Sequence, residues 1–383
     1  MNSIKNQKNI VTAFLVPVIL LAATFCPYSC VQQPEISVMI TPEILNKWVT
    51  NGYGTDLHGY SKMVIIDATS QNSYTADGFV PGAYLMDTNV DLNAERSDGV
   101  ATIASMVPAK EHIDDLIQRV GIDQETVIVI TGDTMLAMGR AYFIFRYWGF
   151  PKQRLKVMNG TNATYSEAGF PLETSAPPEP EGSTYTLCNL TQNTSLRASL
   201  SEMISVAEDT DPESVVIDAR TANEYNGISG APEAFVGHIK TALNQNYTEL
   251  LVDGSSSKPL LPDQDLVSLV DSIGLGGTTT SYVYCHTGWR ASVIFLALDA
   301  VLGYPVKLYD GSWAEWGQMA DEEKQGALQA DSPWRTDTEE RSEAISYSVD
   351  LGSTVQQITD ADSYAPRADL INETDFSVCE TGG

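Results

Sequence analysis

The chain contains one internal duplication, in which corresponding segments lie about 150 residues apart. An apolar run that includes an aspartate occurs at residues 63–68 and again at 215–220. Each run is followed by a tyrosine and a glycine-containing turn. Each copy later carries an Arg-Ala pair, beginning at Arg140 and at Arg290, that opens a second apolar run. Because the offset is the size of a domain, the pattern predicts two copies of one domain and not a solenoid.

The order of segments within each copy predicts the fold class. Short apolar strands alternate with amphipathic helical runs, which is typical of βαβ units around a parallel sheet. We therefore expect an α/β chain with two tandem domains, each a mostly parallel sheet flanked by helices. The expected parts are a first domain over 36–173, a stiff Pro- and Glu-rich linker over 174–184, a second domain over 185–335 and a C-terminal extension over 336–383.

The first thirty residues have the pattern of an export signal. Lys5 and Lys8 precede an apolar run over 10–25, which is short for a bilayer-spanning helix and is interrupted by Pro17. We expect the mature protein to be exported, in a periplasmic or extracellular location. Cys26 and Cys30 follow the run, so attachment of a lipid at either cysteine is left open as the one expected link to a membrane.

The charge of the chain excludes one class of partner. Lys and Arg number 22 against 50 Asp and Glu, a formal net charge of −28. Affinity for nucleic acid depends on neutralising phosphates with basic side chains, so nucleic-acid binding is excluded. We also expect no metal and no cofactor, because the histidines are scattered without ligand spacing, at His58, His112, His238 and His286.

Three cysteines remain once the leader is set aside: Cys188, Cys285 and Cys379. In an oxidising compartment, parity alone suggests a Cys188–Cys379 disulfide with Cys285 left as a free thiol. The alternative is that Cys188 and Cys379 are two unrelated thiols.

The loop from Cys285 to Arg290 carries the strongest chemical signal. It follows an apolar strand and precedes a helical run, so the thiol is expected to face backbone amides and the positive end of a helix dipole, both of which favour a thiolate. Gly288 permits a tight curl of the loop, and Arg290 adds a positive charge. The alternative is a buried structural cysteine beside a surface arginine.

The spacing between Cys285 and Arg290 separates two reaction classes. Cysteine phosphatases place five residues between cysteine and arginine, whereas here there are four, from His286 to Trp289. A smaller ring suits a single terminal sulfur better than a phosphoryl group. The spacing therefore favours sulfur transfer over phosphate hydrolysis.

The chain resembles the tandem-domain rhodaneses, the thiosulfate and 3-mercaptopyruvate sulfurtransferase family. The resemblance covers about residues 36–335 and rests on four motifs that occur in order. They are the loop over 285–290, the segment over 309–317, and the first-copy segments over 141–149 and 168–172.

This resemblance implies a persulfide mechanism with assigned residues. Cys285 and Arg290 are implied as catalytic. The implied substrate-binding residues are His286, Thr287, Gly288, Trp289 and Ala291, and the implied structural residues near the site are Asp218, Arg220 and Trp313. The first-copy loop over 132–140 has no cysteine, so the resemblance implies a catalytically degenerate first domain.

The donor and acceptor are less defined. In the mercaptopyruvate enzymes that the chain resembles, arginines lie between the aspartate at the strand end and the Gly-His-Ile turn, which here are Asp218 and residues 237–239. The span over 221–235 contains no Arg or Lys, and Glu224 lies there instead. We therefore expect a small anionic donor such as thiosulfate in preference to 3-mercaptopyruvate, with cyanide, a thiol or a thioredoxin-like protein as acceptor. The alternative function is an exported sulfur or selenium carrier with little turnover.

Overall fold

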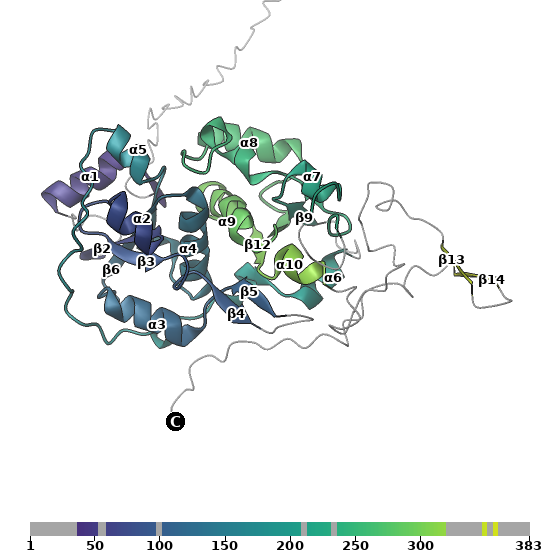
Figure 1. Ribbon diagram of the computed structural model, residues 1–383, viewed down its shortest axis with the longest axis horizontal. Helices are drawn as coiled ribbons and strands as arrows, with labels where there is room; N and C mark the ends of the chain where they lie inside the picture. Colours follow the sequence, from purple (N-terminus) through teal and green to yellow (C-terminus); the bar gives the residue numbers. More distant parts are fainter. Residues whose placement is uncertain are drawn as a thin grey trace, which may run out of the picture. The chain divides into compact units, whose positions relative to one another are not determined.

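The computed structural model describes residues 37–52, 59–96, 102–207, 213–230 and 236–318, and the backbone of 347–350 and 355–358. Two five-stranded sheets organise these residues (Figure 1), and all strand pairs within both sheets are parallel. The prediction of an α/β chain with two parallel sheets flanked by helices is confirmed.

The first sheet uses only strands that precede residue 159. Its order is β1 (Met39–Ile40), β7 (Leu155–Met158), β6 (Thr126–Gly132), β2 (Lys62–Thr69) and β3 (Tyr84–Asp87). The two central strands, β6 and β2, are continuous apolar runs and are buried along most of their length. Such runs are typical of parallel strands whose sheet is covered on both faces.

The second sheet repeats the arrangement of the first. Its order is β10 (Leu243–Asn244), β9 (Ser214–Asp218), β11 (Thr280–Tyr284), β12 (Val306–Tyr309) and β8 (Arg197–Ala198). When corresponding strands are matched, β8, β12, β11, β9 and β10 follow in the same order as β1, β7, β6, β2 and β3. The duplication seen in the sequence therefore extends to the topology.

Helices and short turns connect the strands of both sheets. The helices of the first half are α1 (Pro42–Asn51), α2 (Gln71–Ala76), α3 (Lys110–Arg119), α4 (Met135–Tyr147) and α5 (Asn162–Glu167). Those of the second half are α6 (Leu200–Ala207), α7 (Ala222–Tyr225), α8 (Asp263–Ser272), α9 (Trp289–Leu296) and α10 (Ser312–Trp316), with a π-helical continuation of α9 over Ala297–Leu302. Short 3-10 turns occur at Lys152–Arg154, Leu187–Asn189, Thr194–Leu196, Tyr247–Leu250 and Val252–Gly254.

Two small antiparallel pairs lie outside the parallel sheets. The strands β4 (Ala94–Arg96) and β5 (Ile103–Met106) pair within the first half. The strands β13 (Tyr347–Asp350) and β14 (Val355–Ile358) pair within the segment that the sequence marks as an extension.

Helices α4 and α9 pack against each other and join the two halves (Figure 1). The ring of Phe143 on α4 meets the ring of Phe295 on α9 edge-on, with centroids 5.1 Å apart. A Cβ added at Gly139 would lie 2.9 Å from the carbonyl oxygen of Ser292, so only glycine allows the two backbones to approach this closely. Each of these helices follows the loop after the central strand of its own sheet.

Several predictions concern residues that the structure does not describe. The predicted leader, including Cys26 and Cys30, and the residue Cys379 lie outside the described residues. Cys188 is disulfide-bonded; whether Cys379 is its partner stays a prediction. No helix among the described residues is long and apolar enough to cross a bilayer. The boundaries of the predicted domains also stay predictions, although each sheet draws its strands from only one of them.

Candidate active site

Cys285 lies at the carboxyl end of the central strand β11 and is 1% exposed. Its backbone is held on both sides by the segment that follows β12. The Cys285 amide donates to Oγ of Ser312 (3.3 Å), and its carbonyl accepts from the Trp313 amide (3.0 Å). Ligand sites of parallel sheets lie at this edge, so the position agrees with a chemical role.

The loop after Cys285 leaves backbone amides without acceptors among the described residues. Gly288 is the N-cap residue of α9 and has φ 82°, a left-handed conformation that favours glycine. Among the described residues, the amides of Thr287 and Gly288 donate to no acceptor. Unpaired amides at the N-terminus of a helix form a binding place for negative charge. The loop can therefore hold a thiolate or an anion attached to its sulfur.

Gly288 is also required by its surroundings. A Cβ at this position would lie 3.2 Å from Nη1 of Arg140 and 3.3 Å from Oδ1 of Asp310. Arg140 comes from α4 in the first half, and its Nη1 donates to Asp310 Oδ1 at 2.7 Å, with both side chains fully buried. The loop thus rests on an ion pair that joins the two halves.

Asp310 is further fixed by neighbours from both halves. Its Oδ2 accepts from the Val107 amide of the first half (2.7 Å) and lies 3.4 Å from Nε of Arg197. Burial alone would raise the pKa of Asp310, but the charges of Arg140 and Arg197 hold it below its ordinary value. Asp310 is therefore ionised at neutral pH.

Arg290 forms a two-point ion pair with Glu224 of α7. The terminal guanidinium nitrogens Nη1 and Nη2 each donate to one carboxylate oxygen at 2.8 Å. Partial burial opposes the ionised form of Glu224, yet the hydrogen bonds from Arg290 and Thr221 lower its pKa to about 2. Burial likewise opposes the charge of Arg290, whereas Glu224 and an ionised Cys285 raise its pKa. The positive charge expected beside the loop is present, but a carboxylate balances it.

Asp218 and Arg220 form a buried pair at the end of β9. Arg220 Nη2 donates to Asp218 Oδ2 at 2.6 Å, and the Tyr284 hydroxyl donates to the same oxygen at 2.7 Å. The guanidinium lies 4.5 Å from the ring centroid of Trp313 and donates to the Gly237 carbonyl. These contacts fit the structural roles implied for Asp218, Arg220 and Trp313.

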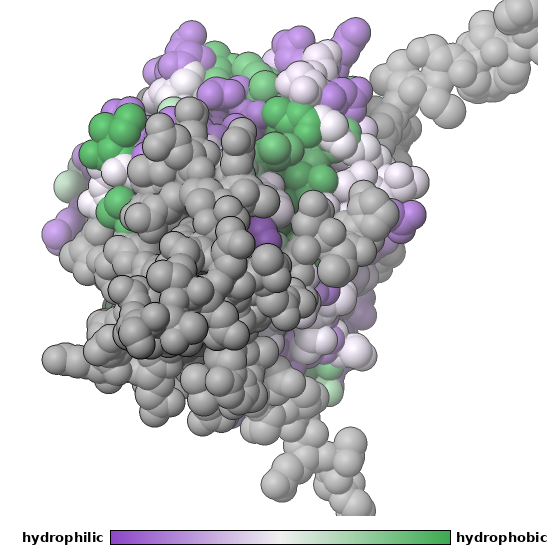
Figure 2. Space-filling model, turned by 90° about the vertical axis from the view of Figure 1, so that its right-hand side faces the viewer, coloured by the Kyte–Doolittle hydropathy of each residue, from purple (hydrophilic) through white to green (hydrophobic). Residues whose placement is uncertain are grey.

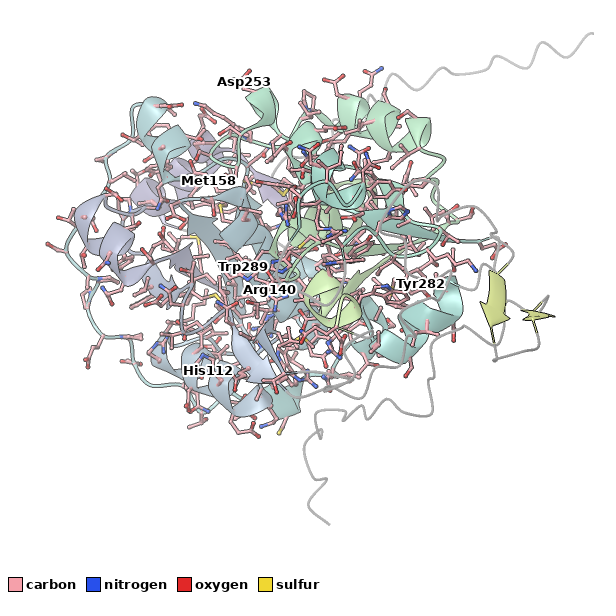
Figure 3. The ribbon with its side chains drawn as sticks, turned by 45° about the vertical axis from the view of Figure 1, so that its right-hand side comes forward. His112, Arg140, Met158, Asp253, Tyr282 and Trp289 are labelled. Carbon is pink, nitrogen blue, oxygen red and sulfur yellow. The ribbon has the colours of Figure 1, made fainter. Side chains whose placement is uncertain are left out.

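The remaining loop residues differ in accessibility. His286 and Thr287 are partly exposed, whereas Ala291 is fully buried within α9 and belongs to the core. The indole Nε1 of Trp289 donates to Oδ1 of Asn93 in the first half at 3.0 Å. Figure 3 shows Trp289 and Arg140 close together where the two halves meet. The structure thus gathers all the predicted residues around one loop, but it places the Ala291 methyl in the core.

Sequence reasoning missed three residues that hold the site. Glu224 was noted only as a charge unsuited to an anionic donor, and Asn93 and Arg140 were given no role at the loop. They lie 66, 196 and 170 residues from Arg290, Trp289 and Asp310, their respective partners. The one available signal was the match of Arg140 to Arg290 in the duplication. No group of three or more His, Cys, Asp or Glu side chains in the described parts of the chain could hold a metal ion.

Comparison with known proteins agrees with this geometry. The profile of the rhodanese-like domain matches residues 199–319, the half that contains Cys285. A putative thiosulfate sulfurtransferase of Mycobacterium leprae, SseA, is 30% identical over 294 residues, which is 74% of this chain and 91% of the relative. The chain belongs to the rhodanese family of sulfurtransferases.

Other rhodanese relatives carry more than one functional name. The 3-mercaptopyruvate sulfurtransferase of Escherichia coli is 28% identical over 64% of this chain and 82% of its own length. The sulfur carrier protein TtuD of Thermus thermophilus is 28% identical over 63% of this chain and 83% of its own length.

Solved structures show the same fold. YnjE superposes with a TM-score of 0.60 at 19% identity, covering 73% of this chain and 65% of YnjE. Wild-type EanB superposes with a TM-score of 0.60 at 18% identity, covering 73% of this chain and 66% of EanB. The prediction of a tandem rhodanese-like sulfurtransferase enzyme is confirmed.

Proposed function

We propose that this rhodanese moves a sulfane sulfur from a small anionic donor such as thiosulfate to a thiol or cyanide through a persulfide on Cys285. The observation that carries the proposal is the position of Cys285 at the end of β11, below a loop whose Thr287 and Gly288 amides have no acceptor among the described residues. Such a loop stabilises negative charge on the sulfur before and after transfer.

The reaction has two displacement steps. The Cys285 thiolate attacks the outer sulfur of thiosulfate, a sulfur–sulfur bond forms, and sulfite leaves with the electron pair of the broken bond. Cyanide or a thiolate then attacks the terminal sulfur of the persulfide. Thiocyanate or a new persulfide is released, and the Cys285 thiolate is restored.

The donor preference rests on the pairing of Arg290. Glu224 occupies Nη1 and Nη2 of Arg290, so only the side-on face of the guanidinium remains for a donor carboxylate, beside the negative charge of Glu224. A donor that needs such a clamp, as 3-mercaptopyruvate would, is disfavoured. Thiosulfate presents one terminal sulfur to a cysteine that is only 1% exposed, so it suits this site better.

A second candidate is a sulfur carrier with little turnover. The name of the relative TtuD favours it, and the same Cys285 loop would serve it. The rate of turnover distinguishes a sulfurtransferase from a sulfur carrier, because a carrier accepts sulfur from a donor but discharges it slowly to cyanide or small thiols. Export, a lipid on Cys26 or Cys30, and a thioredoxin-like acceptor are further proposals, supported by the basic and apolar N-terminus.

The test is the intact mass of the purified protein before and after thiosulfate. The wild type should gain one sulfur atom, cyanide should remove it, and Cys285→Ser should gain none. Asp115→Asn, at an exposed acid of α3 in the first half, is the control variant and should gain the sulfur as the wild type does. If the wild type gains nothing, or if Cys285→Ser gains as much, the proposal is wrong. The same spectra report where the leader is cut and whether a lipid is attached.

A further inference from the structure

A cavity of about 330 Å³ lies in the first half, at the edge of the sheet that corresponds to the Cys285 edge of the second half. It opens where β2 and β6 end, and its walls include Thr69, Asp133 and Asn162. Ser257, from the second half, also lines it, and its carbonyl accepts from the Thr161 hydroxyl at 3.1 Å. Parallel sheets bind ligands at this edge.

The duplication explains why a cavity exists here. Thr69 follows Asp67 by two residues, as Arg220 follows Asp218, and Asn162 follows Gly160 by two, as Trp313 follows Gly311. In the second half, Arg220 and Trp313 are buried and stack on each other. The first half has a threonine and an asparagine at these places, which are much smaller.

With threonine in place of arginine at position 69, the buried carboxyl group of Asp67 has no positively charged partner among the described residues. Asp67 is fully buried, and its Oδ2 accepts from the Thr131 hydroxyl (2.9 Å) and from Nδ2 of Asn162 (2.8 Å). In the second half, Tyr284 makes the bond equivalent to that of Thr131, and Arg220 covers the rest of Asp218. Within the described residues, Oδ1 of Asp67 has no partner. Neither do the Thr69 hydroxyl and Oδ1 of Asn162, and both residues are at least nine-tenths buried.

The charges around the cavity define the ligand. Asp77 and Asp133 line it, and its described wall contains no Lys or Arg. Asp67 does not line the cavity itself but is hydrogen-bonded to Asn162, which does. Unpaired acceptors beside carboxylates call for a donor-rich cation. No metal-binding group occurs among the described residues, so an organic cation is favoured over a metal ion.

We propose that this cavity binds a small organic cation with a guanidinium or ammonium head, which donates to the Thr69 hydroxyl and to Oδ1 of Asn162 and is attracted by the charge of Asp67 behind them. The internal comparison carries the proposal, since the second half supplies from its own chain the group that the first half lacks. The site is separate from Cys285, and the proposal does not depend on the proposed sulfur transfer.

The experiment uses the purified full chain and isothermal titration with methylguanidinium chloride at constant ionic strength. Methylurea, nearly the same shape without the charge, is the matched neutral probe. Asp67→Asn removes the charge while keeping an oxygen for Thr131 and Asn162. Thr69→Arg supplies the guanidinium from the chain itself. Asp115→Asn, an exposed acid of α3 that does not line the cavity, is the control variant.

The wild type and Asp115→Asn should bind methylguanidinium equally and ignore methylurea. Asp67→Asn and Thr69→Arg should each weaken binding ten-fold or more, and sulfur loading of Cys285 should be unchanged in Asp67→Asn. If Thr69→Arg does not fold, Asp67→Asn alone decides. The proposal is overturned if the wild type does not bind methylguanidinium, if it binds methylurea as well, if Asp67→Asn binds like the wild type, or if calcium chloride displaces the probe.

Discussion

Arg140 and Asp310 form a fully buried ion pair between the two halves of the chain, directly beneath Gly288 of the active-site loop. Arg140 occupies the place in the first copy that Arg290 occupies in the second. The first copy therefore supports the Cys285 loop of the second copy.

Arg140→Met should destabilise the protein strongly, because Asp310 would keep its charge in the interior with only Arg197 near it. Loss of one partner of a buried pair typically lowers the free energy of unfolding by about 3–5 kcal/mol. Urea denaturation monitored by tryptophan fluorescence measures the change. The double variant Arg140→Met/Asp310→Asn should recover part of it, and a single variant within about 1 kcal/mol of the wild type would contradict a major role for the pair.

Glu224→Gln should uncover the charge of Arg290. The neutral amide of glutamine does not balance the charge of the Arg290 guanidinium. We therefore expect KM for thiosulfate to fall several-fold and the free energy of unfolding to fall by about 1–3 kcal/mol. Thiosulfate-to-cyanide turnover and thermal unfolding together measure both effects. Glu249→Gln, on an acid of the same half that is not paired with Arg290, is the control; equal changes in both variants would show that Glu224 acts only through net charge.

Ser312→Ala should weaken the support of Cys285. Ser312 is a non-glycine residue with φ 53°, and its hydroxyl accepts from the Cys285 amide and donates to the Tyr309 carbonyl at 2.8 Å. Alanine keeps the left-handed backbone strain but loses the hydrogen bonds to the Cys285 amide and the Tyr309 carbonyl. The loss should lower the free energy of unfolding by about 1–3 kcal/mol. The rate at which iodoacetamide alkylates Cys285 should change in this variant. An unchanged rate would mean that Ser312 does not position the thiol.

Asp67→Asn should change how stability depends on pH. Burial, chiefly, raises the pKa of Asp67 from 3.8 to about 6, so the native state binds its proton more tightly than the unfolded state. Asp67 therefore adds to the free energy of unfolding below pH 4, and this contribution is lost as the pH rises through 6. In the absence of any added cation, the variant should gain about 3 kcal/mol on the wild type between pH 4 and pH 7. Urea midpoints across this range measure the difference, and parallel curves for the two proteins would refute the shift.

The features of the fold that depend on local sequence pattern were predictable from the sequence. The repeat, the parallel strands and the loop from Cys285 to Arg290 follow from apolar periodicity and from glycine and cysteine positions, which are readable along the chain. The pairing of Asp218 with Arg220 was predictable because the two residues are neighbours on the chain.

The partners of the loop were not predictable in the same way. Glu224 reaches Arg290, and Asn93 reaches Trp289, only because the fold brings distant elements together. Charge alone made Glu224 look unfavourable for an anionic donor, whereas in the structure it balances the loop arginine.

Figure 2 shows polar and apolar residues interspersed on the described part of one face. Large apolar side chains are strongly exposed at few described positions, among them Val90 and Ile228. Scattered exposure of this kind is ordinary for a globular chain.

The close contact at Gly132 opposes the introduction of a cysteine into the first copy at the position that corresponds to Cys285. Gly132 follows Thr131 as Cys285 follows Tyr284, so it stands where a second nucleophile would be. A Cβ there would lie 2.5 Å from the Ala68 carbonyl oxygen, and Arg140 is already committed to Asp310. Restoring a cysteine would therefore require the strand, the loop and the interface to change at once. A cysteine at position 132 would therefore not by itself give the first copy a loop like that of Cys285.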